Sequence, residues 1–330
     1  MAKIWEKHIH NKLRELEKYL LEEYKKNHPQ NEVNYAEYEK EFKKRFKKAM
    51  NSLGDLIDKA TNNLNFYRGK GDKPSIKIDQ RLRLLLISQL AGKSNRMMAY
   101  MTSLFSVITG INRSYKTIER LYSDGEIEIA LHNLWQLILE RGNVNNVDCC
   151  GDATGYSLFI SKHYCSYAQK LKEGIKDQSD CEKKCFVYKF ALMDLKKKMY
   201  ICFGTSLISE RKAFDKAMQM LNEFDIKINS IRLDRYYSFP CYTKLFPESK
   251  VYIIPRANSK LGHGNQWYEI MKDFVQNTMN YLEEYFKRNN SESGWAADKK
   301  MFGWNVKQKR EDRINTALFC RAIWHNLLNV

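Results

Sequence analysis

The order of the apolar and amphipathic segments after Val144 constrains the fold of this chain more than any other feature of its sequence. Two apolar runs, CFVYKFALMDL and MYICFGTSL, are separated only by Lys196–Lys198, which is typical of an antiparallel pair of strands. SERKAFDKAMQMLNEF has apolar residues at helical spacing, with Ser209 as the expected N-cap. KINSIRLD and KVYIIPR predict two further strands. Consecutive strands that then alternate with helices predict an α/β fold, a mixed sheet flanked by helices.

The segments on either side of this pattern extend the predicted domain to residues 144–330. VNNVDCCGDATGYSLF predicts a strand, a turn at Gly151–Gly155 and a second strand. QWYEIMKDFVQNTMNYLEEYFKR predicts helix, so that a mostly helical insertion covers about 257–287, and REDRINTALFCRAIWHNLL predicts a final amphipathic helix. Asp194 is followed at once by lysines, so a hairpin turn explains it better than a role in a site.

Residues 1–143 predict helices. In the basic helical region 1–72, KKRFKK at 43–48 either contacts DNA phosphates or forms a solvated helix face. RGKGDKPS, at 68–75, has the composition of a linker. Residues 73–143 predict an apolar helix, a turn and a short helix with Lys116 and Arg120, which resembles a helix-turn-helix, although any small helical bundle gives this pattern. Lys116 and Arg120 are therefore candidate DNA contacts.

The composition favours folded domains without a membrane anchor. The 330 residues are 43% hydrophobic and 13% aromatic, and the longest apolar runs are too short or too polar to span a bilayer. The charged N-terminus does not predict a signal peptide. We therefore expect a soluble cytoplasmic protein, associated with the nucleoid. Cys181 and Cys185, with His163 and Cys165, could bind zinc, but buried thiols are the commoner explanation for such cysteines.

The charge balance indicates the class of partner. Fifty-six Lys and Arg against 39 Asp and Glu leave a formal net charge of +17. Such a surplus favours a polyanion, because neutralising phosphates releases counterions. No basic amphipathic helix with a Trp, Phe and Leu face stands out, so nucleic acid is preferred to a membrane surface.

Three carboxylates lie where one site could form. Asp152 and Asp234 each follow an apolar strand, and ligands commonly bind at strand ends in α/β folds. Glu292 lies in the later stretch YFKRNNSESGWAADK. Three converging carboxylates would suit one or two Mg²⁺ ions. Each also has a simpler explanation, since Asp152 could cap a turn, Asp234 could cap a helix and Glu292 could pair with Lys299.

The stretch around Glu292 has a regular spacing of charged and aromatic residues. If it is one helix, Tyr285, Arg288, Glu292 and Lys299 point to about 0°, 300°, 340° and 320°, a single stripe. A carboxylate on that stripe could hold metal while the cations hold phosphate. A solvated helix with local ion pairs is the alternative. A helix that begins near Ser291 would instead put Tyr285 and Arg288 in a preceding turn.

In this order, GDATG, IRLDRYYS and YFKRNNSESGWAADK resemble the three acidic segments of DDE-type insertion-sequence transposases, which have a ribonuclease-H-like core. Tyr285, Arg288, Glu292 and Lys299 match the Tyr-x2-Arg-x3-Glu-x6-Lys signature of one branch. DRYYS is similar to the segment after the fourth strand of that branch, and IIPRAN, which contains Arg256, to its fifth strand. The resemblance covers about residues 114–330.

The resemblance implies a site and an activity. Asp152, Asp234 and Glu292 would be the catalytic triad and would bind Mg²⁺ or Mn²⁺, with two ions expected. Arg288 and Lys299 would hold the DNA backbone at the transposon end, with Tyr285 nearby and Arg256 as a further candidate contact. The enzyme would cleave the ends of its element and join the 3′-OH to target DNA, by metal-dependent in-line attack first of water and then of a DNA hydroxyl. A homodimer would bring two ends together.

Two other functions fit the same residues. A structure-specific nuclease on this core would cut DNA without joining it. A non-catalytic DNA-binding relic of a transposase would keep the charge without the chemistry, although the three intact acids argue against it. Trp267 or Trp295 could stack on a displaced base, but a buried position in the core is the commoner role of a tryptophan.

Overall fold

The computed structural model describes residues 34–64, 76–104, 112–158, 186–256 and 264–330, together with residues 66 and 106 and part of 15–26. The predicted linker at 68–75 and the four Cys and His residues considered for zinc lie outside these described residues. Among the described residues, no helix is both long and apolar enough to cross a membrane.

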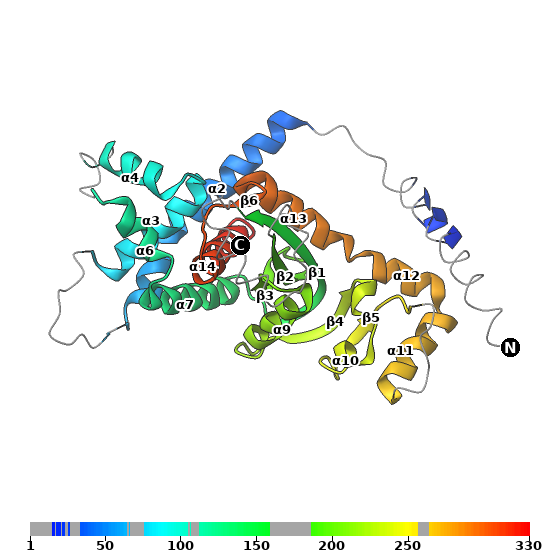
Figure 1. Cartoon of the computed structure of the whole chain (residues 1–330). Coiled ribbons are helices and arrows are strands. Elements are labelled where there is room, and N and C mark those ends of the chain that lie inside the picture. The colour runs from blue at the N-terminus through cyan, green and yellow to red at the C-terminus, as the bar shows by residue number, and fades with distance from the viewer. Residues whose placement is uncertain are drawn as a thin grey trace, which may run out of the picture.

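In the described part of the chain, the centre is a six-stranded mixed sheet in the order β3-β2-β1-β4-β5, with β6 beside the end of β1 (Figure 1). Strands β1, β2 and β3 pair antiparallel, whereas β4 is parallel to both β1 and β5. This topology, with helices on the sheet and a helical region before it, is consistent with a ribonuclease-H-like fold. The strands are β1 (Asn146–Leu158), β2 (Phe186–Asp194), β3 (Tyr200–Ser206), β4 (Lys227–Leu233), β5 (Lys250–Tyr252) and β6 (Asn305–Val306).

Strand β1 corrects the predicted turn at Gly151–Gly155. It is one continuous strand of 13 residues, in which Gly151 pairs with Leu192 and Gly155 with Tyr188. A Cβ on Gly151 would lie 2.6 Å from a methyl carbon of Leu192 and 2.8 Å from one of Leu233, so the glycine makes room for packing and does not turn the chain.

The predicted hairpin between β2 and β3 is confirmed. Asp194 accepts a hydrogen bond from the backbone N–H of Lys197 at 2.7 Å, and Lys198 takes a left-handed conformation with φ of 58°. The predicted helix after β3 is confirmed as well. It is α9 (Glu210–Leu221), and the Ser209 hydroxyl accepts a hydrogen bond from the backbone N–H of Lys212 at 3.3 Å.

Helices cover both faces of the sheet. Lys189 and Phe190 are neighbours on β2 and therefore point to opposite faces. Phe190 contacts Phe214 of α9, with ring centroids 4.9 Å apart, whereas Lys189 forms an ion pair with Asp298 of α13 (Asn289–Phe302). Helix α9 thus covers one face, and α13 lies on the face that also carries Asp152 and Thr154, since Thr154 lies directly opposite Lys189.

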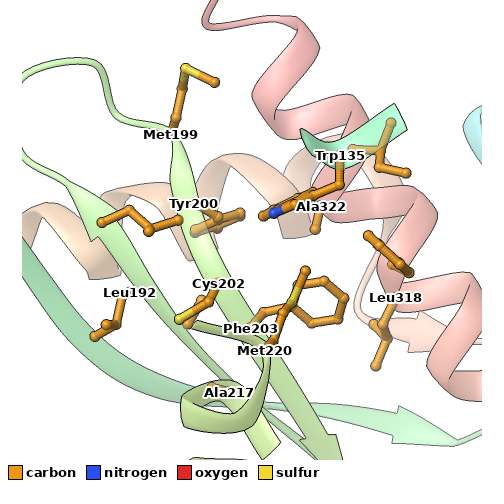
Figure 2. Packing of buried hydrophobic residues seen from close by; sticks show 14 of the residues in the cluster. Trp135, Leu192, Met199, Tyr200, Cys202, Phe203, Ala217, Met220, Leu318 and Ala322 are labelled. Atoms are coloured by element: carbon orange, nitrogen blue, oxygen red, sulfur yellow. The ribbon is translucent and has the colours of Figure 1, made fainter. Parts of the chain in front are cut away.

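The last helix, α14 (Glu311–Leu327), corrects the expectation of an amphipathic helix. All residues from Ala317 to Leu327 are buried, because α14 lies between the sheet and the N-terminal helices. Figure 2 shows Trp135, Phe203, Leu318 and Ala322 gathered in this layer. The indole N–H of Trp324 donates to the carbonyl of Leu86 at 2.9 Å. A helix that is covered on both sides needs no polar face.

The N-terminal helices form a region to one side of α14 (Figure 1). They are α2 (Tyr35–Thr61), α3 (Ile78–Ala91), α4 (Asn95–Leu104), α6 (Tyr115–Leu121) and α7 (Gly125–Arg141). One hydrophobic cluster runs from Ala49 in α2 to Leu328 after α14 and includes the sheet. At the other end of the sheet lie α10 (Pro240–Thr243), α11 (Asn265–Gln276) and α12 (Thr278–Phe286).

Candidate active site

Two carboxylates come together because their strands are neighbours. Asp152 lies within β1, and Asp234 directly follows β4. The parallel register pairs Gly151 with Leu233, so the next residue of each strand, Asp152 and Asp234, lie beside each other. Asp234 precedes the short 3-10 helix Arg235–Tyr237, but its carboxylate makes no capping hydrogen bond to the described backbone. The capping explanation for Asp234 is therefore wrong.

Glu292 reaches this site from α13. Helix α12 ends at Phe286 and α13 begins at Asn289, so the stretch is two helices and not one. Lys287 and Arg288 at the junction keep right-handed helical dihedral angles, with φ near −60°. Arg288 therefore still reaches back over the ring of Tyr285, with its guanidinium carbon 5.6 Å from the ring centroid, and forward to Glu292.

Arg288 joins the carboxylates of two elements. Its Nη1 lies 3.6 Å from Oδ1 of Asp234 and 3.4 Å from Oε1 of Glu292. The pKa of Arg288 is raised, because Tyr285 and the carboxylates of Asp234, Asp152 and Glu292 outweigh the opposing effect of burial. Glu292 thus pairs with Arg288 in this structure, where the simpler explanation had named Lys299. Tyr285 is only 3% exposed, so Arg288 packs over a buried ring.

Asp152 lies in an environment that disfavours its charge. Burial raises its pKa to about 6, the nearby carboxylates of Asp234 and Glu292 add to the shift, and a hydrogen bond from the N–H of Ala153 and the charge of Arg288 oppose it. Like charges that crowd one another in this way are typical of sites that bind a cation. Asp152 does accept a hydrogen bond in the manner of a turn cap, but within a strand.

Lys299 lies over the same face of β1 as Asp152. Its Nζ donates to the hydroxyl of Thr154 at 2.6 Å, two residues along β1 from Asp152. Burial lowers its pKa, and the charge of Asp152 opposes that shift. The centroid of the Trp304 ring lies 4.7 Å from the same Nζ, and Trp304 is 66% exposed. Trp304 was not among the candidate residues predicted from the sequence. Its position just after the helix that carries Lys299 was the available signal.

The other candidate DNA contacts differ in their placement. Arg256 is exposed and donates to the carbonyl of Tyr236 at 3.0 Å, which places it beside the loop that follows Asp234. Lys116 and Arg120 are exposed on α6, within the N-terminal helical region and apart from the three acids (Figure 1). Trp267 and Trp295 are 2% and 4% exposed, so both are core residues and neither is open to a base in this conformation.

The donor set fits a hard divalent cation. Asp152, Asp234 and Glu292 supply carboxylate oxygens, the ligands that Mg²⁺ and Mn²⁺ prefer. The carboxylates of Asp234 and Glu292 raise the pKa of Asp152, and a bound cation would offset this repulsion. In the conformation of the described residues, no three His, Cys, Asp or Glu side chains lie close enough together to hold a metal. The side chain of Glu292 is 59% exposed and held by Arg288, so it has room to move.

The chain is similar to a protein of Archaeoglobus fulgidus described as "Probable transposase for insertion sequence element ISA1214". The two are 39% identical over 298 residues, which are 90% of this chain and 88% of the other protein. No family model matches the chain. Identity at this level over nearly the whole of both sequences reflects common descent, and the chain therefore belongs to the insertion-sequence transposase family that the Archaeoglobus protein represents.

Proposed function

We propose that this protein is a DDE-type transposase that cleaves the ends of its own element and joins the resulting 3′-OH to target DNA. The observation that carries the proposal is that Arg288 contacts Asp234 and Glu292 while all three carboxylates interact electrostatically with it and with one another at Asp152, in a chain homologous to an insertion-sequence transposase. The proposed triad is Asp152, Asp234 and Glu292, and these residues would hold Mg²⁺ or Mn²⁺.

The metal, when bound, supplies Lewis acidity that activates the attacking oxygen and stabilises the leaving oxygen at phosphorus. The residues of the chain prepare the site for it. Asp152 must lose its proton before it can act as a ligand, and Arg288 favours that loss through its charge. Glu292 would have to leave its contact with Arg288 to act as a metal ligand, and Arg288, which also contacts Asp234, would then have donors available for a phosphate.

DNA contacts follow from the cations that surround the acids. The ammonium group of Lys299 is hydrogen-bonded to the hydroxyl of Thr154, and the guanidinium group of Arg256 lies beside the loop after Asp234. We propose that these two residues and Arg288 hold the backbone of the transposon end, because phosphate contacts fix the register of DNA on a protein. Lys116 and Arg120 on α6 would contact DNA farther from the cleaved bond, and a homodimer would hold two ends.

Strand joining separates this function from its alternatives. The experiment is incubation of the full-length protein with a labelled duplex of the DNA that flanks its gene, a supercoiled target plasmid and Mg²⁺ or Mn²⁺. The proposed function predicts cleavage at the element end and label covalently joined to the target, both abolished by chelation and restored by added metal. Cleavage without joining would favour a structure-specific nuclease. Binding in a gel shift without either product would favour a non-catalytic relic.

A further inference from the structure

A group of charged side chains is buried beneath α13. Lys189 of β2 is 0% exposed, Asp298 of α13 is 2% exposed, and His325 of α14 is 6% exposed. The hydroxyl of Tyr200, on β3, completes the group, which is called the buried ionic cluster below. Buried charges are costly unless they are paired, so their presence here needs an explanation.

Asp298 is the centre of the buried ionic cluster. It accepts hydrogen bonds from the Tyr200 hydroxyl at 3.0 Å and from Nδ1 of His325 at 2.7 Å. Nζ of Lys189 lies 3.6 Å from the same carboxylate and has no hydrogen bond to any described residue. Although burial opposes it, His325, Lys189 and Tyr200 together hold the pKa of Asp298 below its usual range.

Both ring nitrogens of His325 are engaged by buried polar partners. Its Nε2 lies 2.8 Å from the carbonyl oxygen of Lys198, which can only accept, so Nε2 carries a hydrogen. Its Nδ1 faces the ionised carboxylate of Asp298, which also only accepts. Lys189 is held among three aromatic rings, 4.8 Å from the centroid of Tyr200, 5.1 Å from that of Trp295 and 5.5 Å from that of Phe203. One carboxylate thus contacts two basic side chains, Lys189 and His325.

The buried ionic cluster ties the helix of the candidate active site to three other elements. Through Asp298, α13 is bonded to β3 and α14 and paired with β2. The next residue, Lys299, is bonded to Thr154 of β1. Glu292 lies less than two turns earlier on the same helix, and Arg288 is the residue just before that helix begins. The position of α13 on the sheet therefore sets where Glu292 and Lys299 stand relative to Asp152.

Close packing does not hold α13 on its outer side. A cavity of about 550 Å³ separates that side from α2 and is lined by residues of α13 that include Asn290, Ser293 and Ala297. Asp298 and His325 line the same cavity. Without directional bonds, the helix could shift or rotate toward this space, because aromatic stacking such as that of Trp295 on Tyr200 tolerates sliding. Hydrogen bonds to Asp298 depend on distance and angle, so they restrict such movement more than stacking does.

We propose that Lys189, Tyr200, Asp298 and His325 are positioning residues, which fix α13 so that Glu292 and Lys299 meet the carboxylates of β1 and β4. The inference rests on the proposed function, because it assigns the purpose of the fixed position to catalysis. Apolar side chains of similar volume commonly stabilise a fold as well as a buried ion pair does, so stability alone does not account for these charges. A role in orienting the site accounts for them, because contacts behind a site commonly hold its residues in position.

The test separates position from stability with the double variant Lys189→Met/Asp298→Asn, which removes the buried Lys189–Asp298 ion pair and keeps the shapes of both side chains. We expect it to melt within about 3 °C of wild type. We expect KM for end DNA to stay unchanged while kcat for cleavage falls about 10- to 100-fold. Backbone hydrogen exchange should accelerate in α13 and not in α9. Wild-type kcat and wild-type exchange in a folded double variant would overturn the proposal.

Milder variants keep the test decisive if the double variant does not fold. Tyr200→Phe removes one hydrogen bond to Asp298, and Tyr281→Phe is its matched control, because the Tyr281 hydroxyl is equally buried but bonds to Val251 and Ile253. Slower cleavage and faster α13 exchange in Tyr200→Phe alone would support the proposal, and equal behaviour of the two would overturn it. If wild type shows no cleavage, the proposed function fails, and exchange confined to α13 still decides whether the cluster holds the helix.

Discussion

At the scale of single residues, Asp152 shows what the candidate active site costs the fold. Its pKa is raised from 3.8 to about 6 by burial and by the carboxylates of Asp234 and Glu292. The folded protein therefore holds this proton more tightly than the unfolded chain does. As a consequence, the contribution of Asp152 to stability declines as the pH rises from about 4 to 6, and the ionised residue destabilises the fold above that range.

Asp152→Asn should therefore stabilise the protein while it removes activity. In metal-free buffer at pH 7.5 we expect the free energy of unfolding to rise by about 1–3 kcal/mol, and the gain to shrink as the pH is lowered toward 4. Chemical denaturation of both proteins at several pH values measures this. A variant that is less stable than wild type at pH 7.5, or a gain that does not depend on pH, would contradict the account of Asp152.

Arg288 is the residue that opposes this repulsion within the site, through its contacts with Asp234 and Glu292. Its charge lowers the pKa of Asp152. Arg288→Ala should therefore raise that pKa and move the acid limb of the pH–rate profile for cleavage to higher pH by about 0.5–1 pH unit. Lys287→Ala is the control, because it removes an equal positive charge from a neighbouring residue that pairs with Glu284 and not with the acids of the site. A profile that shifts equally in both variants would mean that net charge, and not the placement of Arg288, is responsible.

At the scale of elements, the parts that the sequence predicted are those whose pattern is local. The hairpin between β2 and β3 and the capped helix α9 follow from runs of apolar residues and from Asp194 and Ser209. Strand β1 was misread because Gly151 looks like a turn residue until Leu192 and Leu233 are known to need its space. Helix α14 was misread because burial on a second side depends on Trp135 and other distant residues.

The contact between α9 and β3 gives a prediction at this scale. A Cβ on Gly204 would lie 2.0 Å from the carbonyl oxygen of Ala213 and 2.4 Å from the backbone nitrogen of Ala217, and backbone atoms cannot move aside without displacing the helix. Gly204→Ala should lower the free energy of unfolding by about 2–4 kcal/mol. Gly155→Ala on β1, whose nearest neighbour would be Phe186 at 3.7 Å, should change it by less than about 1 kcal/mol. Thermal and chemical denaturation of the two variants test this, and similar losses in both would show that α9 is not packed this closely.

The candidate site was predictable in part for the same reason. Its acids could be found because strand ends and helix spacing are visible in a sequence, and the family resemblance names them. The pairing of Lys189 with Asp298 could not be found, since it depends on which distant segments the fold brings together. The sequence analysis named Lys299 as a pairing partner of Glu292, whereas the structure pairs Glu292 with Arg288.

At the scale of the whole molecule, α14 links the helical region to the sheet. It packs against α3 and α7 on one side and β3 on the other, and one hydrophobic cluster includes all of them. DNA contacts made by Lys116 or Arg120 on α6 would thus be connected through packed elements to the face that carries Asp152. A net charge of +17 over such a molecule suits a long polyanionic substrate that touches more than one region.

The most direct test of the central claim is strand cleavage by Glu292→Gln beside Glu283→Gln. Both changes remove one carboxylate and keep its shape, but Glu283 is an exposed residue of α12 that the site does not use. The account predicts that Glu292→Gln binds end DNA in a gel shift and cleaves and joins it slower by about two orders of magnitude or more, while Glu283→Gln matches wild type. Equal cleavage by the two variants would contradict the account, because Glu292 would then take no part in the chemistry.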